Sequence, residues 1–233
     1  MIAIINQSNV VTDTEAQACV AALQVQVDRD FLPEWGLRAD LKFFSKNSPI
    51  PPDAWQLIIL DNSDQADALG YHDVTATGLP IGKIFAKTTI DIGDNWTVTA
   101  SHELLEMLLD PDITECVTSA DGNILYAKEV ADACEDDSLG YQINGVLVSD
   151  FVTRLWFGSK SRSGEKKYDY MGHISAPFQL LSGGYIGILD LSRTQGWQQL
   201  AAAGKPTMKA RGPVGSRRER RRIPVKDRIP STR

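Results

Sequence analysis

The stretch that most constrains this chain is TASHELLEMLLDPD at residues 99–112, which predicts a helix over residues 99–110. Ser101 is a residue type that commonly caps a helix N-terminus, and Pro111 would end the helix. Between them, apolar residues recur at the spacing of one helix face. These apolar residues are Leu104, Leu105, Leu108 and Leu109. The helix is therefore expected to pack against a core along this face.

On this helix His102 and Glu106 are four residues apart, so their side chains project from one face about one turn apart. The pattern is that of H-E-x-x-H, in which two ligands one turn apart hold zinc and the intervening glutamate acts as general base. Glu103 occupies the position of that glutamate, whereas Glu106 replaces the second histidine. A carboxylate also binds zinc, and a histidine with a carboxylate suits harder metals too. The alternative is a solvated polar stripe on an ordinary amphipathic helix.

The composition is that of a globular protein. The chain has 233 residues, of which 42% are hydrophobic and 23% charged, enough for one large domain or two small ones. No apolar run approaches the length of a membrane span, and residues 1–10 lack the pattern of a signal peptide. The three cysteines show neither metal-pair spacing nor a disulfide framework. We therefore expect a cytoplasmic protein, in a cell or in a host cell, with no membrane partner.

The net charge of −6 conceals a strong asymmetry. Residues 205–233 carry 11 Lys and Arg against two acids, whereas the remaining 204 residues carry 13 basic and 28 acidic side chains. Such a basic arm is expected to be extended or disordered on its own and to bind nucleic acid or an acidic protein surface. The alternative is a tail that only aids solubility. The arginines expected to make the contacts are Arg217, Arg218, Arg220, Arg221 and Arg222.

The N-terminal part predicts an α/β layer. Residues 1–7 read as a buried strand, and Thr12 or Asp13 would cap a long helix that ends near Pro33 and Gly36. Two further strands are expected at residues 39–44 and 55–60.

Residues 61–80 form a long polar segment that we interpret as a loop, and long loops in compact domains are often functional. A strand over residues 81–90 would lead to the motif helix. Later in the chain, Asn144-Gly145 indicates the turn of a hairpin over residues 141–157. A final strand at residues 186–191 and a short helix at residues 195–203 precede the arm.

Beyond the motif helix, several segments carry a resemblance to known proteins. The chain resembles a zincin-type metallopeptidase-like domain and, more narrowly, a group of phage, bacterial and fungal proteins without an assigned activity. The resemblance covers roughly residues 55–190 and implies a zincin-like fold with His102, Glu103 and Glu106 at the motif positions. Glu106 departs from H-E-x-x-H, and its extra charge would reduce the Lewis acidity of a bound zinc. The segments are LGYHD (69–73), SHELLEMLLDP (101–111), EVADACED (129–136), VSDFVTRLWF (148–157) and APFQLLSGGY (176–185).

A catalytic zinc site usually has three protein ligands and a water, so a third ligand must come from outside the helix. Glu129 lies 23 residues past Glu106, and this spacing resembles the gluzincin arrangement. There a downstream glutamate is the third ligand and a nearby aspartate braces the first histidine. The resemblance therefore implies Glu129 as third ligand, with Asp132 as the alternative ligand or as the brace of His102.

Other donors rank lower. His173 comes next as third ligand, and Asp112 last, because metzincin-like enzymes have glycine where this chain has Leu109. His72 and His173 are good ligands at unhelpful sequence distances, and a lone loop histidine is more often a surface residue. If they lie in the site, a histidine or Tyr185 could donate a hydrogen bond to a developing oxyanion.

The sequence thus predicts an α+β fold: a zincin-like mixed sheet with the site helix at residues 99–110, in one domain over residues 1–204, followed by the basic arm. The functional hypothesis is zinc-dependent amide hydrolysis of a peptide or protein, in which Glu103 takes a proton from water and passes it to the leaving amine. By analogy with metallopeptidases, the strand before the helix would bind an extended peptide. The alternative is a non-catalytic structural protein, such as a phage virion component, whose arm binds capsid, a partner subunit or nucleic acid. An oligomer is compatible with either.

Overall fold

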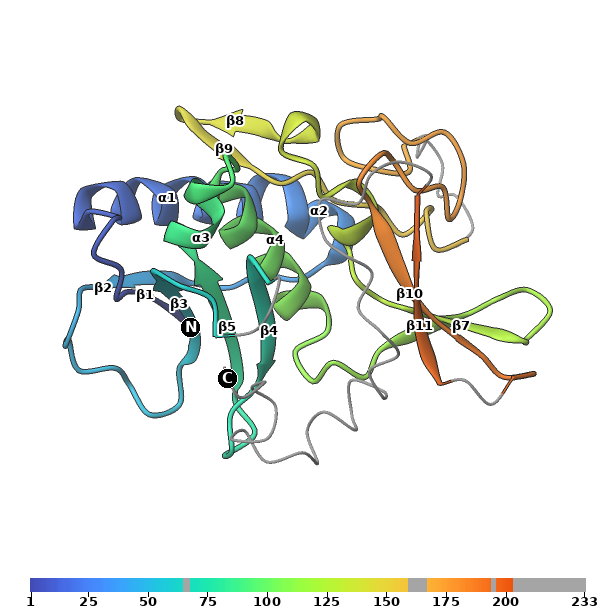
Figure 1. The fold of residues 1–233 in the computed structure, drawn as a ribbon, viewed down its shortest axis with the longest axis horizontal. Coiled ribbons are helices and arrows are strands. Elements are labelled where there is room, and N and C mark those ends of the chain that lie inside the picture. The colour runs from blue at the N-terminus through green and yellow to red at the C-terminus, as the bar shows by residue number, and fades with distance from the viewer. Residues whose placement is uncertain (65–67, 159–166, 194–195, 203–233) are drawn as a thin grey trace.

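The fold is known from a computed structural model, which describes residues 1–64, 68–158, 167–193 and 196–202. The predicted α+β class is confirmed, with helices and mixed sheets in the same molecule (Figure 1). The basic arm, including the five arginines expected to make contacts, lies outside the described residues, and so its conformation and contacts stay a prediction. None of the described helices is both long and apolar enough to cross a membrane.

A five-stranded sheet forms the N-terminal part. In sheet order the strands are β2 (Leu41–Phe44), β1 (Ile2–Asn6), β3 (Trp55–Leu60), β5 (Pro80–Phe85) and β4 (Gly70–Val74). Three parallel pairs join β2 to β1, β1 to β3 and β3 to β5, whereas β4 pairs antiparallel with β5 at the edge.

The helices cover one face of this sheet (Figure 1). Because side chains alternate along a strand, Ile2 and Ile4 of β1 join the large core under the helices. Ala3 and Ile5 point to the other face, where a smaller apolar cluster forms beneath residues 50–54. The main core therefore lies between the sheet and the helices, and the site lies at its β4 edge.

The first helical segment begins where the sequence predicted, at α1 (Asp13–Val25). Thr12 is its N-cap, and Glu15 completes a capping box by accepting from the Thr12 backbone N–H. The single helix expected up to residue 32 is instead divided. A π-helical segment η1 (Gln26–Phe31) follows α1, and α2 (Leu32–Trp35) ends at Gly36, whose φ is +73°.

Two expectations between residues 61 and 90 were wrong. The supposed loop at residues 61–80 contains the edge strand β4, which a turn closed by the Thr75 N–H to Leu79 C=O bond (2.7 Å) joins to β5. The strand expected at residues 81–90 ends at Phe85 and continues as α3 (Ala86–Asp91). The Thr89 hydroxyl donates to the Phe85 carbonyl at 2.9 Å, which helps to turn the chain out of the sheet.

The motif helix is α4 (Trp96–Leu109), and it contacts both β4 and β5. Its N-cap is Asn95, which accepts from the Thr97 N–H at 3.1 Å, so the prediction of Ser101 as the cap was wrong. All of its residues except Thr97 and Thr99 are buried. The helix is therefore central, with side chains packed on every side.

The rest of the chain forms a two-stranded sheet, which contacts α4, and a four-stranded sheet. The hairpin of β8 (Tyr141–Ile143) and β9 (Val146–Val148) has its turn at Asn144 and Gly145, as predicted, but it ends at Val148. The helix expected at residues 195–203 is instead strand β11 (Trp197–Ala201), because this segment pairs antiparallel with β10 (Tyr185–Asp190) along its whole length. The remaining elements are β6 (Cys116–Thr118), β7 (Ile124–Ala127), η2 (Asp132–Cys134) and η3 (Asp137–Leu139).

A buried polar hub fixes α4 against its neighbours. The Ser101 hydroxyl donates to the Gln26 side-chain carbonyl at 2.7 Å and accepts the Ser149 N–H at 3.0 Å. The Gln26 amide in turn donates to the Ser149 C=O at 2.9 Å. Ser101 thus joins the π-helical segment to the chain that follows β9, which explains why a polar residue lies inside the helix.

We predict that Ser101→Ala destabilises the protein by about 2–4 kcal/mol, because two buried groups lose their partner. Urea denaturation followed by circular dichroism measures the change. The control is Ser138→Ala, at an exposed serine, for which a change within about 0.5 kcal/mol is expected. An equal effect of the two substitutions would contradict the role of the hub.

Candidate metal centre

Three segments bring six polar side chains together at the β4 edge of the core. The helix α4 contributes three of them, β4 contributes His72, and the chain after β7 contributes two. Their contacts form one continuous array in which neighbouring groups lie within 4 Å. The six side chains are His72, His102, Glu103, Glu106, Glu129 and Asp132.

Two carboxylates lie beside the same ring nitrogen of His102. Its Nε2 lies 3.3 Å from Glu106 Oε2 and 3.2 Å from Asp132 Oδ1. A brace of a metal-bound histidine would contact the other ring nitrogen, Nδ1. Asp132 instead faces the nitrogen that Glu106 also faces, which is the position of a fellow ligand.

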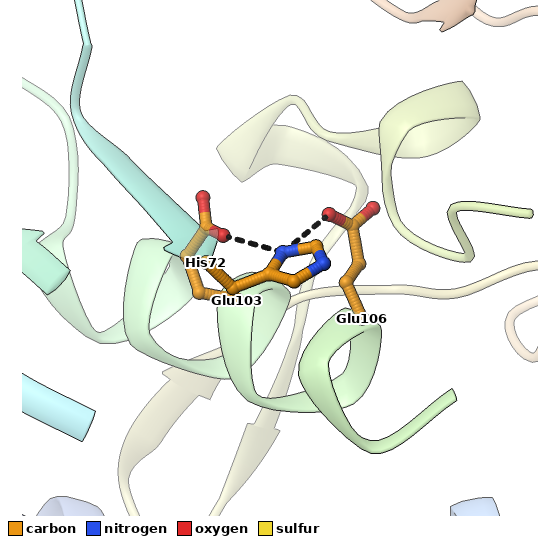
Figure 2. Close-up of side chains that lie close together, drawn as sticks. All are labelled: His72, Glu103 and Glu106. Atoms are coloured by element: carbon orange, nitrogen blue, oxygen red, sulfur yellow. Dashed lines mark hydrogen bonds and ion pairs between the residues drawn. The ribbon is translucent and has the colours of Figure 1, made fainter. Parts of the chain in front are cut away.

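Glu103 points to a different partner. Figure 2 shows the His72 ring lying between Glu103 and Glu106, with Nδ1 3.3 Å from Glu103 Oε2 and 3.8 Å from Glu106 Oε2. The opposite nitrogen, Nε2, lies 3.8 Å from Glu129 Oε2. Glu129 therefore approaches the array through His72, whereas Asp132 approaches it through His102.

The array is buried. Each of the six side chains is at most 10% exposed, so the alternative of a solvated stripe on α4 does not hold. The Glu106 carboxylate also accepts the Ala131 N–H at 3.2 Å, which ties the helix to the segment that carries Asp132. Buried carboxylates need hydrogen bonds, protons or cations, and this site supplies imidazoles and backbone donors.

Glycines permit two close approaches that build the site. A Cβ at Gly70 of β4 would lie 2.7 Å from Thr99 Cγ2 and 2.9 Å from Glu103 Cγ. A Cβ at Gly184 would lie 2.4 Å from the Ala133 carbonyl oxygen, so the chain entering β10 passes directly against η2. The second contact places Tyr185, whose hydroxyl hydrogen-bonds with Asp132.

Burial and the crowded charges shift the proton affinities. Burial and the Glu106 charge raise the pKa of Asp132 to about 7, although His102 lowers it. Burial lowers the pKa of His102, but Glu106 and Asp132 outweigh burial and hold this pKa well above its usual value. Burial raises the pKa of Glu135 to about 8 and that of Tyr185 well above its usual value. Negative charge therefore exceeds what the two histidines can balance, and a bound cation would relieve the excess.

The donors fit a divalent metal ion. His102, Glu106 and Asp132 form one group whose ligand atoms all lie within 4.8 Å of one another, and His72, Glu103 and Glu106 form a second group. Imidazole nitrogens and carboxylate oxygens are ligands that zinc accepts, as do harder divalent ions. The structure thus shows a set of residues that could hold a metal, without specifying which one.

Other candidates lie elsewhere or play smaller parts. His173 contacts Asp150 and Asp169 and not the α4 array, and Asp112 is exposed. The three cysteines are free, as expected. Burial, followed by nearby carboxylates, raises the pKa of the Cys134 thiol, which disfavours the thiolate that a metal ligand requires.

Sequence reasoning undervalued His72. It ranked low because residues 61–80 were interpreted as a loop, whereas β4 carries its side chain into the core beside Glu103. The alternation around residues 70–74 is a strand signal, since His72 is the buried residue at the centre of this strand.

Comparison of the chain with protein-family models, curated proteins and solved structures finds no match.

We predict that, without bound metal, stability falls as pH rises from about 5 to 8. The pKa of Asp132 is raised to about 7 in the folded state, whereas an unfolded aspartate titrates near pH ~3.9, so the folded state holds the extra proton between these values. The pKa of His102 is also raised, and its stabilising contribution is lost as pH rises through that folded value. Thermal unfolding in EDTA at pH 5 and pH 8 measures the effect.

The control for this prediction is Asp132→Asn, which removes one titrating group and should give a shallower decline. A higher melting temperature at pH 8 than at pH 5 in EDTA would contradict the prediction.

Proposed function

We propose that this chain is a zinc-dependent hydrolase of the metallopeptidase type. His102, Glu106 and Asp132 would hold the metal, and Glu103 would act as general base. One observation carries the proposal: His102 Nε2 lies 3.3 Å from Glu106 and 3.2 Å from Asp132, while Glu103 lies beside this group and contacts His72 instead.

The separations agree with shared coordination. Zinc binds nitrogen and oxygen at about 2.0–2.2 Å, so two ligands of one tetrahedral ion lie roughly 3.4 Å apart. The contacts of His102 with Glu106 and Asp132 are close to this value. Zinc bound by three protein ligands would lower the pKa of a water and polarise a carbonyl.

Glu103 is suited to hold and transfer a proton. It follows His102 directly, so its carboxylate lies next to the donor group without belonging to the His102, Glu106 and Asp132 set. His72 Nδ1 contacts Glu103 at 3.3 Å and would orient it. In the proposed reaction Glu103 takes a proton from water and gives it to the leaving amine, a role that contributes about 10²–10⁴-fold in rate.

The edge strand suggests the substrate class. Within the described residues no strand lies beyond β4. Phe85 N–H donates to the Leu69 C=O at 2.9 Å, and antiparallel alternation then directs the backbone groups of Gly70 and His72 away from β5. An extended peptide could add there as a further strand, beside Glu103. The peptide-binding edge would therefore be β4 and not β5, the strand that precedes α3 and α4 in sequence.

We also propose that the chain folds as a zincin-like domain. The motif helix and the five segments that carry the resemblance predict such a domain. A mixed sheet with the motif helix packed on one face, and with the motif side chains at the sheet edge, supports that expectation.

The second candidate is a structural metal site in a non-catalytic protein. It is favoured by the burial of all six side chains and by the surplus donors His72 and Glu129, since structural zinc sites are closed by protein ligands. The protein would then serve as a scaffold, for example in a phage particle. Its basic arm would bind capsid, a partner subunit or nucleic acid.

We predict that His102→Ala removes one equivalent of zinc per chain relative to wild type, because it removes the donor shared by both short contacts. Asp132→Asn should weaken zinc binding at least about 100-fold, whereas Glu129→Gln should weaken it about tenfold or less. Mass spectrometry gives the metal content, and competition with a chelating dye gives the affinity. The reverse order of the two carboxylate variants would assign Glu129 as third ligand.

Glu103→Gln is predicted to keep its zinc and to lose about 10²–10⁴-fold in hydrolysis of an unfolded polypeptide, because the amide side chain cannot accept the proton. The measurement is release of new amino termini from denatured casein. The matched control is Glu115→Gln, at an exposed glutamate, which should match wild type. If wild type holds zinc and hydrolyses no polypeptide, the structural candidate replaces the enzyme.

A further inference from the structure

A second cluster of metal-ligating side chains lies outside the array around α4. It consists of Asp150, Asp169 and His173, whose ligand atoms all lie within 4.8 Å of one another. Two chain segments carry it, one after β9 and one before β10. These segments pair through backbone bonds from Tyr170 N–H to the Phe151 C=O (2.8 Å) and from Thr153 N–H to the Tyr168 C=O (2.8 Å).

Backbone donors fix the two carboxylates. Asp150 Oδ1 accepts the N–H groups of Phe151 (2.8 Å) and Met171 (3.1 Å). Asp169 accepts the N–H groups of His173 and Ile174, both at 2.8 Å, one on each oxygen. These bonds hold both side chains in place with no contribution from a cation.

One oxygen in this cluster lacks a hydrogen bond. Asp150 Oδ2 is fully buried and has no hydrogen-bond donor among the described residues. It points to the imidazole of His173, whose Nδ1 lies 3.5 Å away and 3.6 Å from Asp169 Oδ2. In the described part of the chain, no Lys or Arg forms an ion pair with either carboxylate. Two buried carboxyl groups therefore face one neutral or singly charged ring.

We propose that Asp150, Asp169 and His173 form a second metal site, which takes a divalent cation of the zinc class. The separations of 3.5 and 3.6 Å from His173 Nδ1 are close to the ~3.4 Å between two ligands of one tetrahedral zinc ion. The His173 side chain is 39% exposed, so the cation would enter from solvent and keep a water ligand. The site would clamp the chain after β9 to the turn at residues 169–174.

A shared proton is the competing way to balance this cluster. Burial and the neighbouring Asp169 raise the pKa of Asp150 to about 9, so a metal-free cluster would keep a proton at neutral pH. Metal content distinguishes a shared proton from a bound divalent cation. Only a cation would add an equivalent of metal per chain that is lost when His173 is replaced.

The test uses the full chain, stripped with EDTA, loaded with zinc and dialysed. Because His102→Ala empties the proposed α4 site, this variant should retain one equivalent of zinc per chain. The double variant with His173→Ala should retain none. The control is Met171→Ala in the same background, at an exposed residue of the same turn, and it should retain one equivalent. No zinc in the His102→Ala variant, or zinc that persists in the His173→Ala double variant, would overturn the proposal.

Asp150→Asn guards against a trivial loss of folding. Its side-chain oxygen can still accept from Phe151 and Met171, while one buried negative charge is removed. In EDTA its melting temperature should equal or exceed that of wild type, and added zinc should no longer raise it in the His102→Ala background. If zinc raised the melting temperature of the His102→Ala, Asp150→Asn double variant as much as that of the His102→Ala variant, the result would contradict the proposed site.

The two sites can fail separately. If wild type holds one equivalent that is lost with His173→Ala and kept with His102→Ala, the second site stands and the proposed function at α4 falls. If the single equivalent is lost with His102→Ala and kept with His173→Ala, the second site falls and the α4 centre stands.

Discussion

The burial of carboxylates around one helix is the constraint on which the rest of this structure depends. Glu103, Glu106, Glu129 and Asp132 lie in the interior, beside the imidazoles of His72 and His102. An ionised carboxylate without a partner is among the most costly groups to bury. The fold therefore requires protons or a cation at this place, and a chain that needed only a stable core would favour apolar side chains there. The buried polar side chains of α4 are therefore better explained by a chemical role than by a contribution to stability.

Precise placement follows from contacts that do not involve the donors themselves. Ser101 and Gln26 fix α4 to the π-helical segment. Gly70 lets β4 approach α4, and Gly184 lets the start of β10 approach η2, so closely that a Cβ at either position would clash. Each donor thus stands on an element that is already held. Sites supported in this way keep their geometry when the metal is absent, which favours tight and selective binding.

The sequence predicted the elements with strong periodicity and the local motif, including β1, β3, the Thr12 cap and the helix that bears His102 and Glu106. It failed where pairing overrides local pattern: β4 was interpreted as loop and β11 as helix, because both depend on partner strands. The motif spacing within one helix also predicted that Glu103 would lie next to His102 and Glu106, and all three side chains are buried in the array. Spacing could not choose between Asp132 and Glu129, because the proposed choice depends on which histidine each carboxylate contacts: Asp132 lies beside His102, whereas Glu129 lies beside His72.

The two acidic clusters are mechanically connected. Val152 N–H donates to the Val130 C=O at 2.7 Å, so the segment that follows Asp150 is bonded to the segment that precedes Asp132. The carboxylates of both clusters also raise the pKa of the Cys134 thiol, after burial, which places this cysteine in the field of both. A cation that fixes Asp150 and Asp169 would therefore restrain the backbone that presents Asp132 to His102. The stability of the Asp150 cluster and the position of Asp132 beside His102 would then both depend on the backbone bond between Val152 and Val130.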